Sequence, residues 1–232
     1  MKLLALDTAS AQCSAALLYD DRVCSRSTVT ARDHATLILP MIDALLAEAG
    51  MKLQQLDGIA FGRGPGSFTG VRIAAAVTQG LAAGADLPVL PVSDLRALAA
   101  QARRLAPGAG TSSGHVLACM DARMGEVYWG VFEDSDALPA APGWSEAVSA
   151  PAALPEGLRG TLRRAAGRGL SAHPTLPEWL GLPSSACLPD AEPHALDVAA
   201  LAALDIAGGH AWLDALAAQP VYLRDQVAQL PR

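Results

Sequence analysis

A glycine-rich segment at residues 62–73, GRGPGSFTGVRI, has the composition of a loop that holds phosphate. Glycines permit tight turns, hydroxyls cap a following helix, and the N–H groups at a helix start attract anions. The residues that could contribute in this way are Gly62, Gly64, Gly66, Ser67, Thr69 and Gly70. A P-loop also needs a lysine for the β- and γ-phosphates, and here only Arg72 follows, one turn into the helix. The segment therefore predicts either a phosphate site or a tight strand-to-helix turn.

A second candidate lies at residues 6–10, LDTAS, where an apolar run ends in Asp7 and Thr8. In enzymes that split ATP, a carboxylate at such a strand end can hold Mg²⁺. A lone Asp at this place can equally cap a turn. Both interpretations stay open for Asp7 and Thr8, one nucleotide-proximal and one structural.

The histidines and cysteines are too dispersed to form a metal site. The five histidines contain no H-x-x-x-H or H-E-x-x-H pair, and the four cysteines contain no C-x-x-C. In a chain without an evident export signal, such cysteines are typical of reduced thiols. We expect no metal, no cofactor and no disulfide framework.

The elements that must position these residues alternate between strands and helices. Apolar runs predict strands at residues 2–9, 13–19, 22–30, 56–62 and 87–92, and helical spacing predicts helices at 33–50, 69–84 and 94–105. Pro40 should kink the first helix or start its main segment, and Gly50 should end it. The order β-β-β-α-β-α-β-α predicts a mixed sheet with helices, in the α/β class.

A Gly-, Pro- and Ser-rich break at residues 105–114 divides the chain. Beyond it the pattern partly restarts, with strands at 115–122 and 126–132 and a helix at 194–216, while residues 139–193 show no clear pattern. Asp121 and Arg123 flank the turn between these two strands, where a salt bridge is the simpler interpretation. The second half therefore resembles a reduced copy of the first, and we expect domains at residues 1–106 and 107–232.

The helix that follows the glycine-rich segment has few polar residues. In VRIAAAVTQGLAAG, residues 71–84, only Arg72, Thr78 and Gln79 are polar. A helix that is apolar nearly all round does not leave one side in water. Its small residues Ala76, Gly80 and Ala83 recur on one face, which predicts close approach by another element or another chain.

The 232-residue chain has a net charge of −6, from 17 basic and 23 acidic residues. Proteins that bind nucleic acid alone normally present a basic face, so we expect no such binding by the isolated chain. No apolar run reaches the roughly 18 residues of a membrane span, and the N-terminus lacks the apolar region of a secretory signal. We expect a cytoplasmic protein that does not contact membranes.

Five segments of the sequence match the pattern of one family. They are LDTAS, H-x-x-x-I-L-P at 34–40, GRGPGSFTGVRI at 62–73, DARMGEVYW at 121–129 and PVYLRDQVA at 220–228. Through them the chain resembles the TsaB (YeaZ) family of bacterial tRNA threonylcarbamoyladenosine biosynthesis. The resemblance spans nearly the whole chain, although residues 135–190 carry no matching motif.

The resemblance implies the fold of actin, Hsp70 and the sugar kinases: two related ribonuclease H-like domains, here with the second reduced. It also implies a non-catalytic subunit that binds and activates the related transferase TsaD together with the ATPase TsaE. TsaD transfers a threonylcarbamoyl group from its adenylate to N6 of adenosine 37, and tRNA would meet this chain only within that complex. Without TsaD, the chain would form a homodimer.

The sequence itself argues against catalysis. The catalytic relatives hold a metal through an H-x-x-x-H pair, but here His34 is followed by Ile38. Their second-domain phosphate loop, Asp-x-Gly-Gly-Thr, is replaced after Asp121 by Ala-Arg-Met, and AAGRG at residues 165–169 only weakly resembles the glycine pair that seats adenosine.

Two other functions are weaker alternatives. A small-molecule kinase of the same fold, with Asp7 on Mg²⁺, would have to turn over ATP without the second-domain motif. A protease would need a metal pair or a Ser/His/Asp set, and neither has a recognisable context in the sequence.

We therefore expect the helices at residues 34–49 and 70–84 to form a docking face for TsaD, and for a second copy of the chain when TsaD is absent. The first helix would contribute side chains beside its core-facing Ile38, Ile42 and Leu45. The expected interface residues are Leu37, Met41, Arg72, Ile73, Ala76, Gly80 and Ala83.

Overall fold

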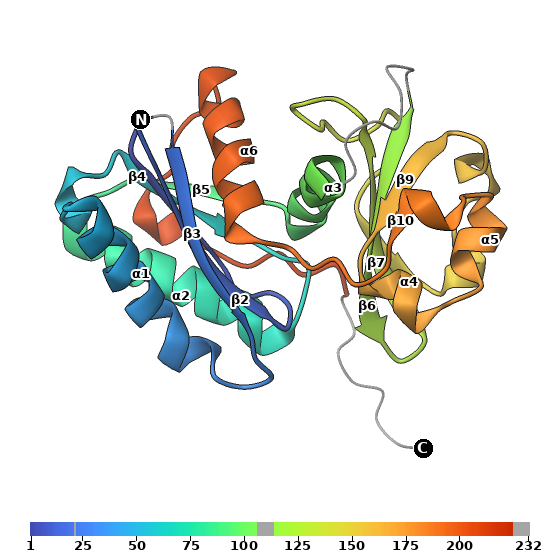
Figure 1. The fold of residues 1–232 in the computed structure, drawn as a ribbon, viewed down its shortest axis with the longest axis horizontal. Coiled ribbons are helices and arrows are strands. Elements are labelled where there is room, and N and C mark those ends of the chain that lie inside the picture. Colours follow the sequence, from blue (N-terminus) through green and yellow to red (C-terminus); the bar gives the residue numbers. More distant parts are fainter. Residues whose placement is uncertain (21, 106–113, 225–232) are drawn as a thin grey trace.

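The computed structural model describes residues 1–20, 22–105 and 114–224, and it contains two five-stranded sheets side by side. Helices lie on both faces of each sheet (Figure 1). From left to right in that view, the layers are α1 and α2, the first sheet, α6 and α3, the second sheet, and α4 and α5. The molecule is therefore a row of alternating helix and sheet layers.

The first sheet has the strand order β3-β2-β1-β4-β5. Strands β1, β2 and β3 form an antiparallel meander, and β4 and β5 add to β1 in parallel. Its strands are β1 (Leu3–Asp7), β2 (Gln12–Tyr19), β3 (Arg22–Val29), β4 (Gly58–Gly62) and β5 (Val89–Val92). Because successive side chains in a strand alternate between faces, Leu4 and Leu6 pack under α1 and α2 while Leu3 and Ala5 face α6.

The second sheet repeats this arrangement. Its strand order is β10-β9-β6-β7-β8, in which an antiparallel β6–β7–β8 meander is extended in parallel by β9 and β10. Its strands are β6 (His115–Arg123), β7 (Glu126–Glu133), β8 (Ala147–Ser149), β9 (Leu162–Ala166) and β10 (Cys187–Leu188). With three residues in β8 and two in β10, it is the smaller copy. The predicted fold class, a duplicated ribonuclease H-like fold with a reduced second half, is confirmed.

The helices of the outer layers differ in length between the halves. The first sheet carries α1 (His34–Ala49) and α2 (Phe68–Ala85), while the second carries the short helices α4 (Arg168–Ala172) and α5 (Leu176–Leu180). Helix α1 continues through Pro40 and ends at Gly50, which adopts the left-handed conformation. Short 3₁₀ turns complete the chain at Leu53–Gln55, Pro151–Ala153, Glu156–Leu158, Ser184–Ala186 and Ala215–Ala217.

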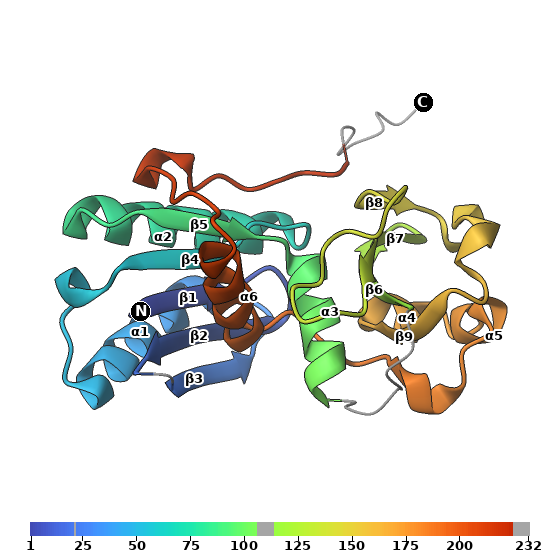
Figure 2. The ribbon, with the colours of Figure 1, turned by 90° about the horizontal axis from the view of Figure 1, so that it is seen from above.

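Helices α3 (Asp94–Leu105) and α6 (Ala195–Ala207) fill the space between the sheets. Helix α3 packs on the second sheet, and α6 crosses back to pack on the first (Figure 2). Arg96 of α3 forms a bidentate pair with Asp205 of α6, with N–O distances of 2.7 and 2.8 Å. Arg104 pairs with Asp197 in the same way, at 2.9 and 2.8 Å. Bidentate pairs fix both distance and orientation, so they join the two halves in one arrangement.

Three sequence-based expectations need correction. Helix α2 does not stop at Gly84 but runs to Ala85, and Asp86 in the left-handed conformation ends it. The helix predicted at 194–216 ends at Ala207, because Gly208 and Gly209 follow. Residues 139–193, which show no clear pattern, contain β8, β9, β10, α4 and α5. The predicted linker at 105–114 and the predicted domain boundary at 106/107 coincide with residues 106–113, which lie outside the described part of the chain.

The four cysteines are free, and two of them, Cys13 and Cys119, are buried. Burial raises the pKa of the Cys13 thiol to about 11 and that of Cys119 to about 12, so both stay protonated at neutral pH. No helix among the described residues is both long enough and apolar enough to span a membrane.

Candidate functional site

The glycine-rich segment forms a tight connection between β4 and α2. Three of its N–H groups already have acceptors within the protein: Arg63 donates to Val92 O at 2.9 Å, Ser67 donates to Ala9 O at 2.6 Å, and Gly64 donates to Asp94. Ser67 also caps α2 by accepting from the Gly70 N–H at 3.4 Å. An anion held by this loop would have to compete with these bonds, so the geometry favours the strand-to-helix turn over a phosphate cradle.

Two glycines of this loop are required by close backbone packing against the end of β1. A Cβ built on Gly66 would overlap Ala9 O, and one built on Gly70 would overlap Thr8 O. The Thr8 hydroxyl donates to Gly70 O at 2.7 Å, which fastens the start of α2 to the same strand end. These contacts account for Gly66 and Gly70 without any ligand.

Asp7, the candidate Mg²⁺ ligand, is fully buried. Its Oδ1 accepts from the Ala9 N–H at 3.2 Å, as a turn-capping carboxylate does. Burial, the largest influence, raises the pKa of the Asp7 carboxyl. A carboxylate that holds Mg²⁺ for a nucleotide has to be accessible from solvent, and the Asp7 carboxylate is not.

The second-half hairpin between β6 and β7 is closed by its own salt bridge. Arg123 donates from its guanidinium and from its backbone to Asp121, at 3.0 and 2.8 Å. Arg123, Met124 and Gly125 all have positive φ angles, as a tight hairpin turn needs. The predicted salt bridge is confirmed, and the Asp121 side chain is occupied by its own turn.

His34 and Ile38, the two positions compared with the metal-binding histidine pair, both make structural contacts within this chain. His34 opens α1 and its Nε2 lies 2.8 Å from Ser10 O, while Ile38, one turn later, is fully buried in the core. Among the described residues, no three His, Cys, Asp or Glu side chains are grouped as metal ligands.

A cavity of about 800 Å³ lies between the halves, where the glycine-rich loop, the β6–β7 hairpin and the start of α4 meet. Three arginines line it, and each is paired with a carboxylate: Arg123 with Asp121, Arg168 with Glu192 at 3.1 Å, and Arg224 with Glu126. A phosphate group bound by any of these arginines would have to compete with its carboxylate partner.

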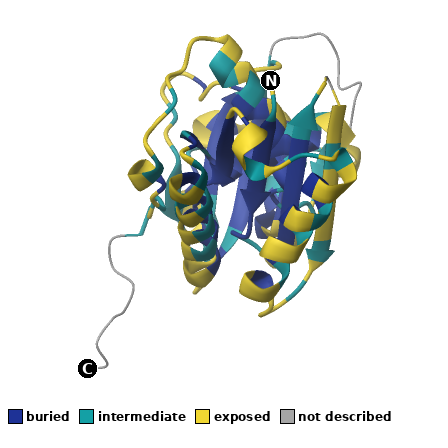
Figure 3. Cartoon of the chain, turned by 90° about the vertical axis from the view of Figure 1, so that its left-hand side faces the viewer, coloured by how far each residue is buried: buried dark blue, intermediate teal, exposed yellow. Residues whose placement is uncertain are grey.

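The surface of α1 and α2 is the second candidate site. These helices lie side by side on the outer side of the first sheet, away from the second half (Figures 1 and 3). Ala76, Gly80 and Ala83 are exposed, and a Cβ added to Gly80 would meet no atom within 4 Å. Five apolar side chains of α1 and α2 are only partly buried: Leu37, Met41, Ile73, Val77 and Leu81. The small residues therefore do not pack in the core of this chain.

One feature of this surface could not be read from the sequence. The Arg72 guanidinium lies 3.5 Å from the centre of the Phe68 ring and donates to Tyr222 Oη at 2.8 Å. Tyr222 belongs to the segment after α6, which Figure 2 shows running from the first half toward the second. Val221 in the same segment donates to Arg63 O at 2.7 Å. Phe68 and Tyr222 are each about half exposed, so they extend the α2 surface.

Comparisons with known proteins identify the family of this chain. A family model described as TsaD, tRNA N6-adenosine threonylcarbamoyltransferase, matches residues 27–161. A Haemophilus influenzae protein named tRNA threonylcarbamoyladenosine biosynthesis protein TsaB is 39% identical, over 98% of this chain and 95% of its own length. The chain belongs to the TsaB (YeaZ) family.

Other members of the TsaB family agree with this assignment. The Escherichia coli TsaB is 37% identical over 98% of this chain and 96% of its own length. The structure of YeaZ from Pseudomonas aeruginosa superposes with a TM-score of 0.80 at 41% identity, covering 96% of this chain and 99% of YeaZ. The similarity therefore includes both halves of the chain.

Proposed function

We propose that this chain is a non-catalytic subunit of bacterial tRNA threonylcarbamoyladenosine synthesis that binds and activates a TsaD transferase. The observation that carries the proposal is the whole-length similarity to proteins named for that biosynthesis. The TsaE ATPase would complete the complex, and tRNA would bind through the complex, since this chain carries a net charge of −6.

Three features of the chain support a role without catalysis. The carboxylate at the end of β1, Asp7, is buried and bonded to its own backbone. The position of the second metal histidine is taken by the core residue Ile38. The hairpin at Asp121 is closed by Arg123. In each of these three places the residue makes a structural contact within the chain.

The α1–α2 surface supports the docking part of the proposal. Its exposed small residues, Ala76, Gly80 and Ala83, permit helices to approach closely, and the apolar side chains beside them would become buried on contact. A TsaD protein is the occupant we propose, because the chain matches a TsaD family model and two related folds can pair through equivalent helices. When the transferase is absent, a second copy of this chain would occupy the same surface.

Size-exclusion chromatography with light scattering tests this docking. The chain alone should elute as a dimer, and adding the TsaD protein of the same organism should convert it to a heterodimer of one copy each. Separate elution of the two proteins at micromolar concentration would contradict the proposal.

The isolated chain is expected to hydrolyse no ATP above the rate of a buffer blank. The reason is that Asp7 does not reach the cleft and that the cleft arginines are paired. A phosphate-release assay with Mg²⁺ and ATP, repeated on two independently purified samples, measures this. ATP turnover that co-purifies with the chain and disappears in an Asp7→Asn variant would favour the small-molecule kinase alternative.

A further inference from the structure

Two buried carboxyl groups meet beneath the glycine-rich loop. Asp7 closes β1 and Asp94 opens α3, and neither is exposed to solvent. A Cβ built on Gly62 would overlap both Asp7 Oδ2 and Asp94 Oδ1, so the two oxygens share the space that this glycine leaves free. The two side chains are within hydrogen-bonding reach of each other.

The other two carboxyl oxygens already have donors. Asp7 Oδ1 accepts from the Ala9 N–H, and Asp94 Oδ2 accepts from the Gly64 N–H. Asp7 Oδ2 and Asp94 Oδ1, however, have no partner as long as both groups are ionised, because a carboxylate only accepts hydrogen bonds. Two adjacent negative charges that are fully buried would also repel each other strongly. A single proton would form a hydrogen bond between the two unpaired oxygens and would remove one of the two negative charges.

We propose that Asp7 and Asp94 share a single buried proton, which lies between Asp7 Oδ2 and Asp94 Oδ1. The carboxyl that carries the proton donates it to the facing oxygen of the other. The second oxygen of each group continues to accept its backbone N–H, from Ala9 for Asp7 and from Gly64 for Asp94. The pair fastens the glycine-rich loop to β1 and α3. This inference is independent of the docking proposal.

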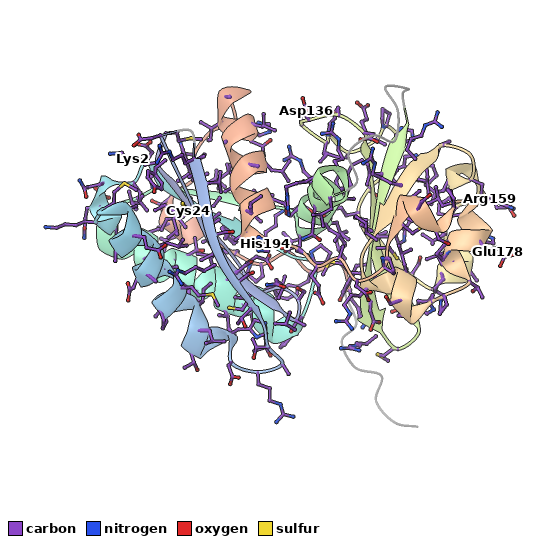
Figure 4. All side chains as sticks on the ribbon, viewed as in Figure 1. Lys2, Cys24, Asp136, Arg159, Glu178 and His194 are labelled. Carbon is purple, nitrogen blue, oxygen red and sulfur yellow. The ribbon has the colours of Figure 1, made fainter. Side chains whose placement is uncertain are left out.

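The groups around the pair do not compensate for two charges. Arg63, the cation that faces Asp94, is also bonded to Glu146 at 3.2 Å. His194, at the junction of the two halves in Figure 4, accepts the Leu196 N–H at Nδ1, and burial lowers its pKa, so it is neutral.

Two other titratable groups face Asp7. Glu192 acts on Asp7 as a like charge. The Cys13 thiol, which also faces Asp7, stays protonated. Burial is the largest influence on both carboxyls, and it raises the pKa of Asp94 well above its ordinary value.

With the shared proton in place, Asp7 cannot bind a cation or a ligand in the cavity between the halves. Both of its oxygens are used, one by Ala9 and one by Asp94, so neither is available to a cation or a phosphate-bound water. It also gives Gly62 a specific role, since any side chain there would separate the two carboxyls. The aspartate at the end of β1 thus becomes part of a structural clamp.

The pH dependence of stability tests the proposal. The folded state would keep a proton that the unfolded state releases above the ordinary Asp pKa of about 4. The unfolding constant of the wild type should therefore rise about tenfold per pH unit, relative to Asp94→Asn, from about pH 4 up to the raised pKa of Asp94, and then level off. The Asp94→Asn amide can replace the proton, because it donates to Asp7 and accepts from Gly64 at every pH. The control Asp43→Asn, at an exposed position of α1, should keep the wild-type profile.

Carbon-13 NMR of the aspartate carboxyls in the wild-type protein gives a second test that needs no folded variant. One of the two buried carboxyls should remain protonated well above the ordinary Asp pKa of about 4, where the other is ionised. Identical pH profiles for wild type and Asp94→Asn, or ordinary titration of both carboxyls, would overturn the proposal. So would a rise in melting temperature with added Mg²⁺ that Asp94→Asn abolishes, because this would place a cation between the two groups.

Discussion

An Ala76→Arg variant is expected to bind the TsaD protein at least about a hundredfold more weakly than the wild-type chain, a loss of roughly 3 kcal/mol. The arginine would hold the two helix surfaces apart and would lose water around its charge on binding. Because Ala76 is exposed on α2, the folded chain can accommodate the larger side chain without repacking. Titration calorimetry with purified TsaD measures the change.

A matched control separates docking from folding. Ala200→Arg adds the same side chain at an exposed alanine of α6, which packs on the opposite face of the first sheet. Both variants should melt close to the wild-type temperature, and only Ala76→Arg should lose binding. Unchanged affinity in Ala76→Arg would place the interface elsewhere on the chain.

A Gly70→Ala variant is expected to be destabilised by about 3 kcal/mol. The new Cβ would overlap Thr8 O and would lie 3.3 Å from the Ala9 Cα, and backbone atoms at the end of a central strand cannot move away as a flexible side chain can. Relieving the overlap would also disturb the hydrogen bond from the Thr8 hydroxyl to Gly70 O. Urea denaturation measures the change in unfolding free energy.

The same substitution on the same helix provides the control. A Cβ added to Gly80 would meet no atom within 4 Å, and the helical backbone there suits alanine. Gly80→Ala should therefore stabilise the chain by about 0.5–1 kcal/mol. If both variants lost equal stability, the close packing between α2 and the end of β1 would not be the reason for Gly70.

The first half of the fold was predictable because its signals are local. Apolar strands are separated by turn residues, Gly50 ends α1, and the Ser93 hydroxyl accepts from the Arg96 N–H at the start of α3. The second half is harder to read because charge interrupts its pattern. In β9 the buried Arg164 pairs with Asp134 at 3.0 Å, which hides a core strand behind a basic residue.

The site depends on contacts between residues far apart in the sequence. Asp94 looks like an ordinary first-turn acid of α3, and nothing near it in the sequence indicates that it meets Asp7. Tyr222 lies in a segment with no helix or strand signal, yet it holds Arg72 at the start of α2. By contrast, the helical spacing of Ala76, Gly80 and Ala83 predicted a shared face, and all three are exposed.

The most direct test of the account is the amount of threonylcarbamoyladenosine formed in tRNA by purified TsaD and TsaE with the threonylcarbamoyl-adenylate and ATP. Modification should require the wild-type chain, should be supported equally by Ala200→Arg, and should fall to background with Ala76→Arg. This chain should form no product without TsaD. Equal modification in the absence of the chain, or product formation by the chain alone, would contradict the proposed role as a non-catalytic partner of the transferase.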